Sequence, residues 1–159
     1  ALGRGAIDGL KLAANVAAML IAFVSVIAMF NYMLSFAGTS LQDIMGLFFK
    51  PLAWTMGVPW SEAQIMGTLM GEKLALTELI AYDNLRTYLM NGEISNRTAI
   101  IASYALCGFA NFGSIGIQIG GLSSIAPERR KDLAILAFKA MIGGALASWI
   151  TACIAGLLI

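Results

Sequence analysis

Charged residues are spaced so that long uncharged segments alternate with short polar ones. Residues 12–36 and 98–126 carry no charge, and residues 133–159 carry only Lys139. An α-helix rises about 1.5 Å per residue, so segments of this length can cross the roughly 30 Å apolar core of a bilayer. The pattern therefore predicts an all-α integral membrane protein with several transmembrane helices.

The first 60 residues divide into two segments that differ in polarity. Residues 1–37 are predicted to form a polar lead-in and a scaffold transmembrane helix. Residues 38–60 are predicted to be a linker with an interfacial helix, because polar residues and Pro51 interrupt the helical spacing of apolar residues, and Trp54 and Trp60 follow. Tryptophan is enriched at membrane interfaces, although an ordinary loop helix explains the pattern equally well.

Residues 61–91 are predicted to form a re-entrant helical hairpin, which enters and leaves the membrane on one side. As a single transmembrane helix, the segment would place several charged side chains at membrane depth, each at a cost of roughly 2.5–3.5 kcal/mol. Divided at Leu76 and Thr77, it becomes two arms that are each too short to cross. We expect Ser61 to cap the first arm and Thr77 the second, with Glu78 in the first turn, where the helix dipole favours a carboxylate.

Residues 95–126 are predicted to form a discontinuous helix. Three glycines crowd into residues 108–116 together with Asn111 and Ser114. Glycine costs about 1 kcal/mol relative to alanine inside a helix, and asparagine and serine offer the backbone competing hydrogen bonds. Backbone that unwinds inside a membrane is tolerated only against protein or a wet cavity. We therefore interpret the unwound segment as a binding site, followed by a final transmembrane helix at residues 127–159.

Composition narrows the classes of function. The chain is 59% hydrophobic and 12% charged with a formal net charge of +1, which excludes a strongly basic nucleic-acid-binding surface. It contains no histidine, which rules out a histidine-based metal site or catalytic triad. No nucleophile stands beside an evident base, so we expect neither enzyme activity nor a cofactor. The two cysteines, Cys107 and Cys153, lack CxxC spacing and are expected to be reduced.

A few residues at membrane depth are the candidate ligand-binding groups. Glu78 is the ionisable one; an intramembrane carboxylate is a functional hypothesis by default, and a structural ion pair with Lys73 is the alternative. Asn111 and Ser114 can donate and accept hydrogen bonds, which suits hydroxyl and amide groups, or they satisfy the unwound backbone. Phe109 is a weaker candidate, because most apolar aromatic residues belong to the core.

One discontinuous helix and one re-entrant hairpin make up half of a recurring transporter design. In many secondary transporters such a pair occurs twice, in inverted repeats around a site near the membrane midplane. The sequence shows one copy and no internal repeat. Residues 61–159 are therefore interpreted as one half of a transport domain, with the other half expected in a preceding segment.

Two stretches resemble the C-terminal half of the concentrative nucleoside transporters, in a bacterial-type member. They are Gly108-Phe109-Ala110-Asn111-Phe112-Gly113-Ser114-Ile115-Gly116 and Gly71-Glu72-Lys73-Leu74-Ala75-Leu76-Thr77-Glu78-Leu79. The family pattern at the hairpin tip is Asn-Glu-Phe, where this chain has Thr77-Glu78-Leu79. The resemblance covers nearly the whole chain.

The resemblance implies a secondary active symporter that imports nucleosides with sodium or protons by alternating access. It implies that Glu78, Asn111 and Ser114 bind the ribose, that Phe109 lies on the nucleobase side, and that Thr77 stands beside them at the hairpin tip. It also implies a multi-pass homotrimer among the lipids of the bacterial inner membrane, with the coupling-ion site in the preceding half of the transporter. From the composition we expect no nucleic-acid partner. A carrier of another small polar solute and a non-transporting membrane scaffold are the alternatives.

Overall fold

The chain folds into helices joined by short turns. The computed structural model describes residues 2–159, with every side chain in that range except those of residues 4, 19, 23, 124 and 125. The described residues are 83% helical and contain no strand, which confirms the all-α class. The elements are α1 (Leu2–Ser35), α2 (Leu41–Thr55), α3 (Ala63–Ala75), α4 (Glu78–Met90), α5 (Asn96–Leu106), α6 (Phe112–Ile125), η1 (Pro127–Arg129) and α7 (Arg130–Leu158).

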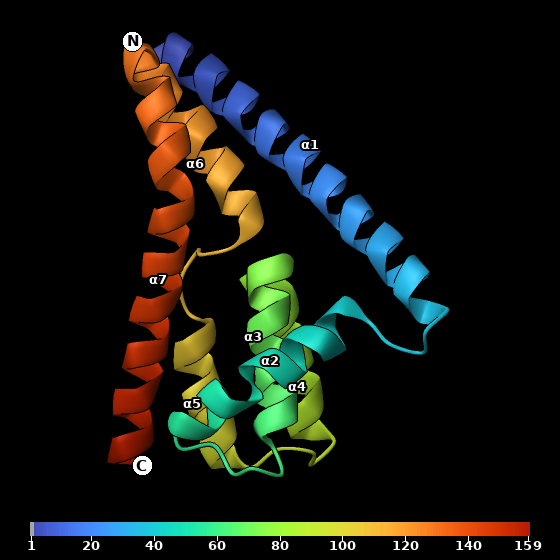
Figure 1. Ribbon diagram of the computed structural model, residues 1–159. Coiled ribbons are helices and arrows are strands. Elements are labelled where there is room, and N and C mark those ends of the chain that lie inside the picture. The colour runs from blue at the N-terminus through green and yellow to red at the C-terminus, as the bar shows by residue number, and fades with distance from the viewer. Residues whose placement is uncertain (1) are drawn as a thin grey trace.

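The two longest helices, α1 and α7, start near each other and then diverge (Figure 1). Helix α6 lies between them at that end of the molecule and contacts both. Helices α2 to α5 gather along the half of α7 that leads to the C-terminus (Figure 1). The loop between α5 and α6 therefore connects two parts of the molecule, and α7 runs beside both of them.

Helix length separates the described helices into two classes. The stretches Gly5–Ser35 and Pro127–Leu158 are long and apolar enough to cross a membrane. Helices α3 and α4 have 13 residues each, and α5 and α6 have 11 and 14. At about 1.5 Å per residue, each of these four helices spans only about 16–21 Å, less than the apolar core of a bilayer.

The core forms where α2 lies across α3 and α5 packs beside them. The two backbones of α2 and α3 approach so closely that a Cβ atom added to Gly67 would lie 2.4 Å from the carbonyl oxygen of Gly46. Several large apolar side chains are fully buried around this crossing: Met56, Val58, Met66, Leu69, Met70, Ile101 and Leu106. The short helices are thus held by a core of their own.

Two helix boundaries differ from the sequence prediction. The polar lead-in is not separate from the first helix, because α1 already begins at Leu2. Extending an existing helix adds one hydrogen bond for each residue fixed and costs little. Pro51 does not interrupt the second helix, since α2 continues past it while Phe49 and Ala53, on either side, are buried in the core. That packing outweighs the backbone hydrogen bond lost at proline.

The start of the first hairpin arm also differs from the prediction. Ser61 does not cap α3; the N-cap residue is Glu62, and it makes no side-chain capping bond. The Glu62 carboxylate instead accepts hydrogen bonds from the backbone nitrogen and the Oγ of Ser95, at 3.0 and 2.9 Å. The carboxylate receives two hydrogen bonds from Ser95, more than a single capping bond to the start of α3 would provide. Glu62 therefore connects the start of α3 to the turn that precedes α5.

Candidate functional site

The backbone between α5 and α6 is non-helical over residues 107–111. Cys107 is extended, with φ −61° and ψ 135°, and Gly108 has a φ of +105°. L-residues with a side chain rarely adopt a positive φ of this size, whereas glycine does so without steric cost. A Cβ atom at Gly108 would also lie 3.0 Å from the Oγ of Ser148. The glycine therefore permits both the turn of the chain and its close approach to α7.

Asn111 restarts the helix beyond this segment. It is the N-cap residue of α6, and its Oδ1 accepts a hydrogen bond from the backbone nitrogen of Ser114 at 2.7 Å. In return, the Oγ of Ser114 accepts from the backbone nitrogen of Asn111 at 3.3 Å. This reciprocal capping box satisfies two donors that a helix start would otherwise leave unpaired. It uses the oxygen of the Asn111 amide and leaves the Nδ2 group available to donate.

The tip of the hairpin meets the amide of Asn111. Helix α3 ends at Ala75, Leu76 turns the chain with ψ −102°, and α4 begins at Glu78. The Nδ2 of Asn111 donates to the Oε2 of Glu78 at 3.2 Å. Glu78 lies in the first turn of α4, where the positive end of the helix dipole stabilises a carboxylate. Two residues that are 33 positions apart in the sequence thus form one polar pair.

The remaining sequence-predicted residues surround this pair at different depths. Thr77 is the N-cap of α4, but the expected capping bond is not formed, and Glu78 supplies the favourable charge at this helix start. Ser114 is 1% exposed, and its hydroxyl is fully engaged in the capping box. Phe109 is 48% exposed, so its ring does not belong to the core. The structure therefore brings Glu78 and Asn111 into direct contact, with Ser114 behind them.

Hairpin side chains occupy the carbonyl end of α5, a feature that the sequence analysis missed. The last carbonyl groups of a helix lack partners within it. Here the Tyr82 hydroxyl of α4 donates to the carbonyl oxygen of Ser103 at 2.7 Å, and the Lys73 Nζ of α3 lies 3.3 Å from that of Ala105. The expected alternative pairing of Lys73 with Glu78 is not what the structure has. The available signal in the sequence was a lysine within a mostly apolar arm of the hairpin.

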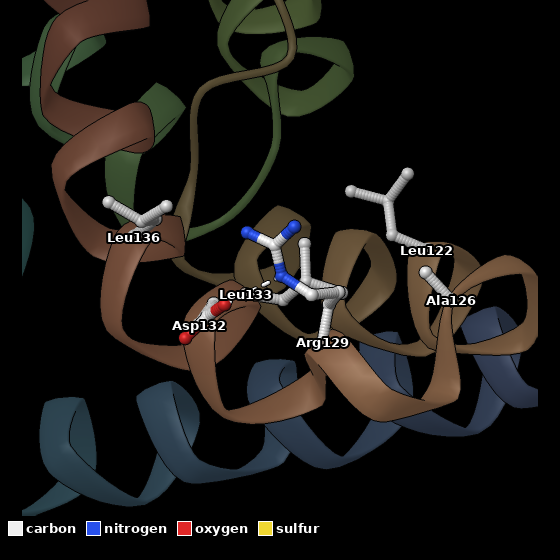
Figure 2. A pocket seen from close by; sticks show the side chains of 6 residues that line it. All are labelled: Leu122, Ala126, Arg129, Asp132, Leu133 and Leu136. Atoms are coloured by element: carbon white, nitrogen blue, oxygen red, sulfur yellow. Dashed lines mark hydrogen bonds and ion pairs between the residues drawn. The ribbon is translucent and has the colours of Figure 1, made fainter.

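A separate cavity lies where α6, η1 and α7 meet (Figure 2), and neither Glu78 nor Asn111 lines it. Its volume is about 280 Å³, and it is lined by Leu122, Ala126, Arg129, Asp132, Leu133 and Leu136. The Nε of Arg129 donates to Asp132 at 2.7 Å, and both side chains are more than half exposed. The charged groups at this cavity satisfy each other, and none of the sequence-predicted residues lines it.

Comparison with known proteins places the chain in a family. Residues 1–156 match the sequence pattern described as "Na+ dependent nucleoside transporter C-terminus". The chain is 47% identical over 166 residues to "Uncharacterized transporter YutK" of Bacillus subtilis, and the match covers all of this chain and 41% of that protein. It is 44% identical to "Putative nucleoside permease NupX" of Escherichia coli, covering 40% of it, and 42% identical to mouse "Sodium/nucleoside cotransporter 1", covering 28% of it.

Solved structures of one transporter, CNTnw, share the fold. A variant of CNTnw in an intermediate state matches 99% of this chain and 41% of that chain, with a TM-score of 0.90 and 46% sequence identity. CNTnw in an inward-facing substrate-bound state matches 98% of this chain and 38% of that chain, with a TM-score of 0.82 and 48% identity. The chain spans about two fifths of the length of the bacterial relatives it matches. The chain belongs to the family of Na+ dependent nucleoside transporters, of which it matches the C-terminal part.

Proposed function

We propose that the chain is the C-terminal part of a secondary active transporter that imports nucleosides together with sodium ions or protons. The observation that carries the proposal is the meeting of Glu78 and Asn111 between a hairpin tip and a helix break. Half-helix ends that face a common point are a recurring way to bind substrates near the middle of a membrane. The names of the relatives, a nucleoside permease and a sodium/nucleoside cotransporter, support the same substrate class.

The chemistry of this pair suits a ribose. A carboxylate accepts hydrogen bonds, and the vicinal 2′ and 3′ hydroxyls of a ribose can offer two to it. Hydrogen bonds to an ionised acceptor are roughly twice as strong as neutral ones. Glu78 is partly exposed, while Asn111 is 1% exposed and held in place by its cap. In the proposed complex the sugar hydroxyls donate to Glu78, and the Asn111 amide, no longer bonded to Glu78, supplies a fixed donor to the sugar.

We assign supporting roles to three further residues. Phe109 precedes Asn111 by two positions and is about half exposed, so it can contact an aromatic nucleobase. Ser114 holds the cap that orients Asn111, and through that cap it positions the amide for the ribose. Thr77 carries an unengaged hydroxyl next to Glu78 at the hairpin tip. These residues approach the pair from both the hairpin and the discontinuous helix.

The proposed architecture has residues 1–37 as scaffold, residues 38–60 as an interfacial linker and residues 61–159 as half of a moving transport domain. Helices α3 and α4 form the re-entrant hairpin, and α5 and α6 the discontinuous transmembrane helix. The chain matches an intermediate state of CNTnw with a TM-score of 0.90 but its inward-facing and outward-facing states with 0.82 and 0.81, at 45–48% identity throughout. That difference supports relative movement of the parts during transport. The assembly is proposed to be a homotrimer in the bacterial inner membrane.

Uptake measurements with the complete protein test this function. Proteoliposomes are loaded without nucleoside and given radiolabelled uridine or adenosine under an inward sodium gradient, an inward proton gradient or no gradient. We expect concentrative uptake of at least one nucleoside under one of the two gradients. If neither uridine nor adenosine is bound or taken up, the proposal is overturned, and another polar solute or a non-transporting scaffold is favoured. An empty-liposome control measures leakage.

A further inference from the structure

Lys73 is a fully buried lysine whose contacts the proposed function does not use. It lies in the last turn of α3 and is 0% exposed. Its Nζ lies 3.3 Å from the carbonyl oxygen of Ala105, 3.5 Å from that of Cys107 and 3.4 Å from the Oγ of Ser148. A lysine is almost never fully buried unless its charged end is satisfied. Its three oxygen neighbours therefore need an explanation.

The three oxygens match what an ammonium group requires. An ammonium has three N–H donors and no acceptor, and each oxygen neighbour can accept one hydrogen bond. The hydroxyl of Ser148 donates to the carbonyl oxygen of Cys107, so its own lone pair faces Lys73. The neighbouring carboxylate of Glu72 is engaged elsewhere, by the Nδ2 of Asn84 at 2.9 Å. The acceptors of Lys73 are thus neutral groups, two carbonyl oxygens at the break in the discontinuous helix and one hydroxyl on α7.

The position of these oxygens gives the lysine a specific electrostatic role. Ala105 lies in the last turn of α5, where the helix dipole is negative and carbonyl groups lack intrahelical partners. Cys107 is the first residue of the non-helical segment, and Gly108 follows it with a positive φ. A cation at this point stabilises the end of α5 and fixes where the extended backbone leaves it.

We propose that Lys73 is a positioning residue for the substrate site, a tethered cation that holds the segment 107–111 so that Asn111 meets Glu78. This inference rests on the proposed function, because it concerns the same site. In this arrangement the hairpin forms hydrogen bonds with the discontinuous helix on both sides of its break. Helix α3 holds the α5 side through Lys73, and α4 holds the α6 side through Glu78.

Substrate binding affects the contact between Glu78 and Asn111 but not the contacts of Lys73. A ribose inserted between Glu78 and Asn111 replaces their direct hydrogen bond. Lys73 lies on the other side of the break and does not touch either residue, so its hydrogen bonds to α5 and α7 persist. The hairpin, α5 and the adjoining part of α7 therefore remain one unit when the site is loaded, and the site closes around substrate without separation of these helices.

Hydrogen–deuterium exchange of the complete protein tests the position of the segment without relying on transport. Lys73→Met removes the ammonium and leaves an unbranched side chain one atom shorter, and Lys139→Met is the matched control, because Lys139 is exposed on α7. We expect Lys73→Met to raise amide exchange in peptides covering residues 105–112 by about tenfold, as for the loss of a charge-assisted hydrogen bond. Peptides from residues 63–70 in the core should exchange as in the wild type, which a general folding defect would not allow.

Equilibrium binding of uridine and adenosine provides the second readout. The dissociation constant of whichever nucleoside binds should rise by about tenfold in Lys73→Met and stay unchanged in Lys139→Met. Ser148→Ala removes one acceptor and one donor to Cys107 without removing the buried charge, and should change both readouts in the same direction by about threefold. If Lys73→Met does not fold, Ser148→Ala decides the question.

The outcomes separate this inference from the proposed function. If the wild type binds no nucleoside but Lys73→Met raises amide exchange selectively in residues 105–112, the proposed function fails. The role of Lys73 in holding the segment 107–111 then stands without it. If nucleosides bind, and neither exchange nor affinity changes by more than about twofold in Lys73→Met or Ser148→Ala, the positioning role is overturned. Equal loosening of residues 105–112 and of the core at 63–70 also overturns it, because Lys73 would then serve the fold as a whole.

Discussion

Asn111 donates to Glu78 with its amide nitrogen while its amide oxygen caps α6. The Nδ2 lies 3.2 Å from the Oε2 of Glu78, and the Oδ1 accepts from the backbone nitrogen of Ser114 at 2.7 Å. The two ends of this side-chain amide therefore serve two purposes, one at the turn between α3 and α4 and one at the start of α6. Substitutions can separate these purposes, since serine also caps helices well but has no amide.

Asn111→Ser and Asn111→Ala are predicted to differ in stability but not in binding. Both remove the donor to Glu78, and we expect the affinity for uridine or adenosine to fall by at least about tenfold in each. Only Asn111→Ala also removes the cap, which costs about 1 kcal/mol of stability. Equilibrium binding and thermal unfolding of the purified protein measure the two effects. Retained nucleoside affinity in Asn111→Ser would contradict the assigned role of the amide.

Glu78→Gln is predicted to reduce nucleoside uptake in proteoliposomes by at least about tenfold. The change keeps the shape of the side chain but replaces an ionised acceptor by a neutral amide, which forms hydrogen bonds of roughly half the strength. Glu93→Gln is the matched control, because Glu93 is exposed in the turn between α4 and α5. The wild-type rate in Glu78→Gln, with both proteins folded and equally incorporated, would remove Glu78 from the site.

Local signals in the sequence located the breaks between the short helices. Gly108 lies inside the non-helical segment 107–111, and Asn111 and Ser114 cap the start of α6, because glycine and capping residues act on the backbone next to them. Gly113 and Gly116, which the prediction counted toward the break, lie within α6, which begins at Phe112. Charged residues amid short apolar stretches similarly divide the segment near Leu76 and Thr77, where α3 ends and α4 begins. The position of a helix end depends on residues next to it in the chain, and these residues can be read directly from the sequence.

The partners of Lys73 and Tyr82 depend instead on tertiary packing. Lys73 contacts groups 32, 34 and 75 positions away in the sequence, and Tyr82 reaches one 21 positions away. Which face of α3 meets α5 is decided by the crossing of α2, α3 and α5, including the close approach of Gly46 and Gly67. Helical periodicity alone places Lys73 in an arm but does not show what it faces.

The close approach of α2 and α3 makes Gly67 sensitive to substitution. A Cβ atom at Gly67 would lie 2.4 Å from the carbonyl oxygen of Gly46 and 3.1 Å from the backbone nitrogen of Lys50, and backbone atoms cannot move aside cheaply. We expect Gly67→Ala to lower stability by about 1–3 kcal/mol through overpacking. In Gly120→Ala the new methyl meets nothing within 4 Å, so the better helix propensity of alanine should leave stability unchanged or raise it by up to about 1 kcal/mol. Thermal unfolding in detergent compares the two, and equal effects would contradict the tight crossing.

The ionised carboxylate of Glu62 is predicted to stabilise the folded chain at neutral pH but not in acid. It lies at the open end of the hairpin, before α3 begins. Burial alone would raise its pKa, but hydrogen bonds from the side chain of Thr98 and from the backbone and side chain of Ser95 together bring the pKa below the ordinary value of 4.5. Because the folded-state pKa is the lower one, this stabilisation is complete above the ordinary value and is lost as the pH falls through the folded-state value.

Thermal unfolding between about pH 6 and about pH 3.5 measures this loss. The unfolding temperature of the wild type should fall more across this range than that of Glu62→Gln, which has no carboxylate to protonate. Glu128→Gln, a change at an exposed position in η1, should follow the wild type. Because Glu62 joins the start of α3 to Ser95 ahead of α5, parallel curves for the wild type and Glu62→Gln would mean that this tie contributes nothing to stability through its charge.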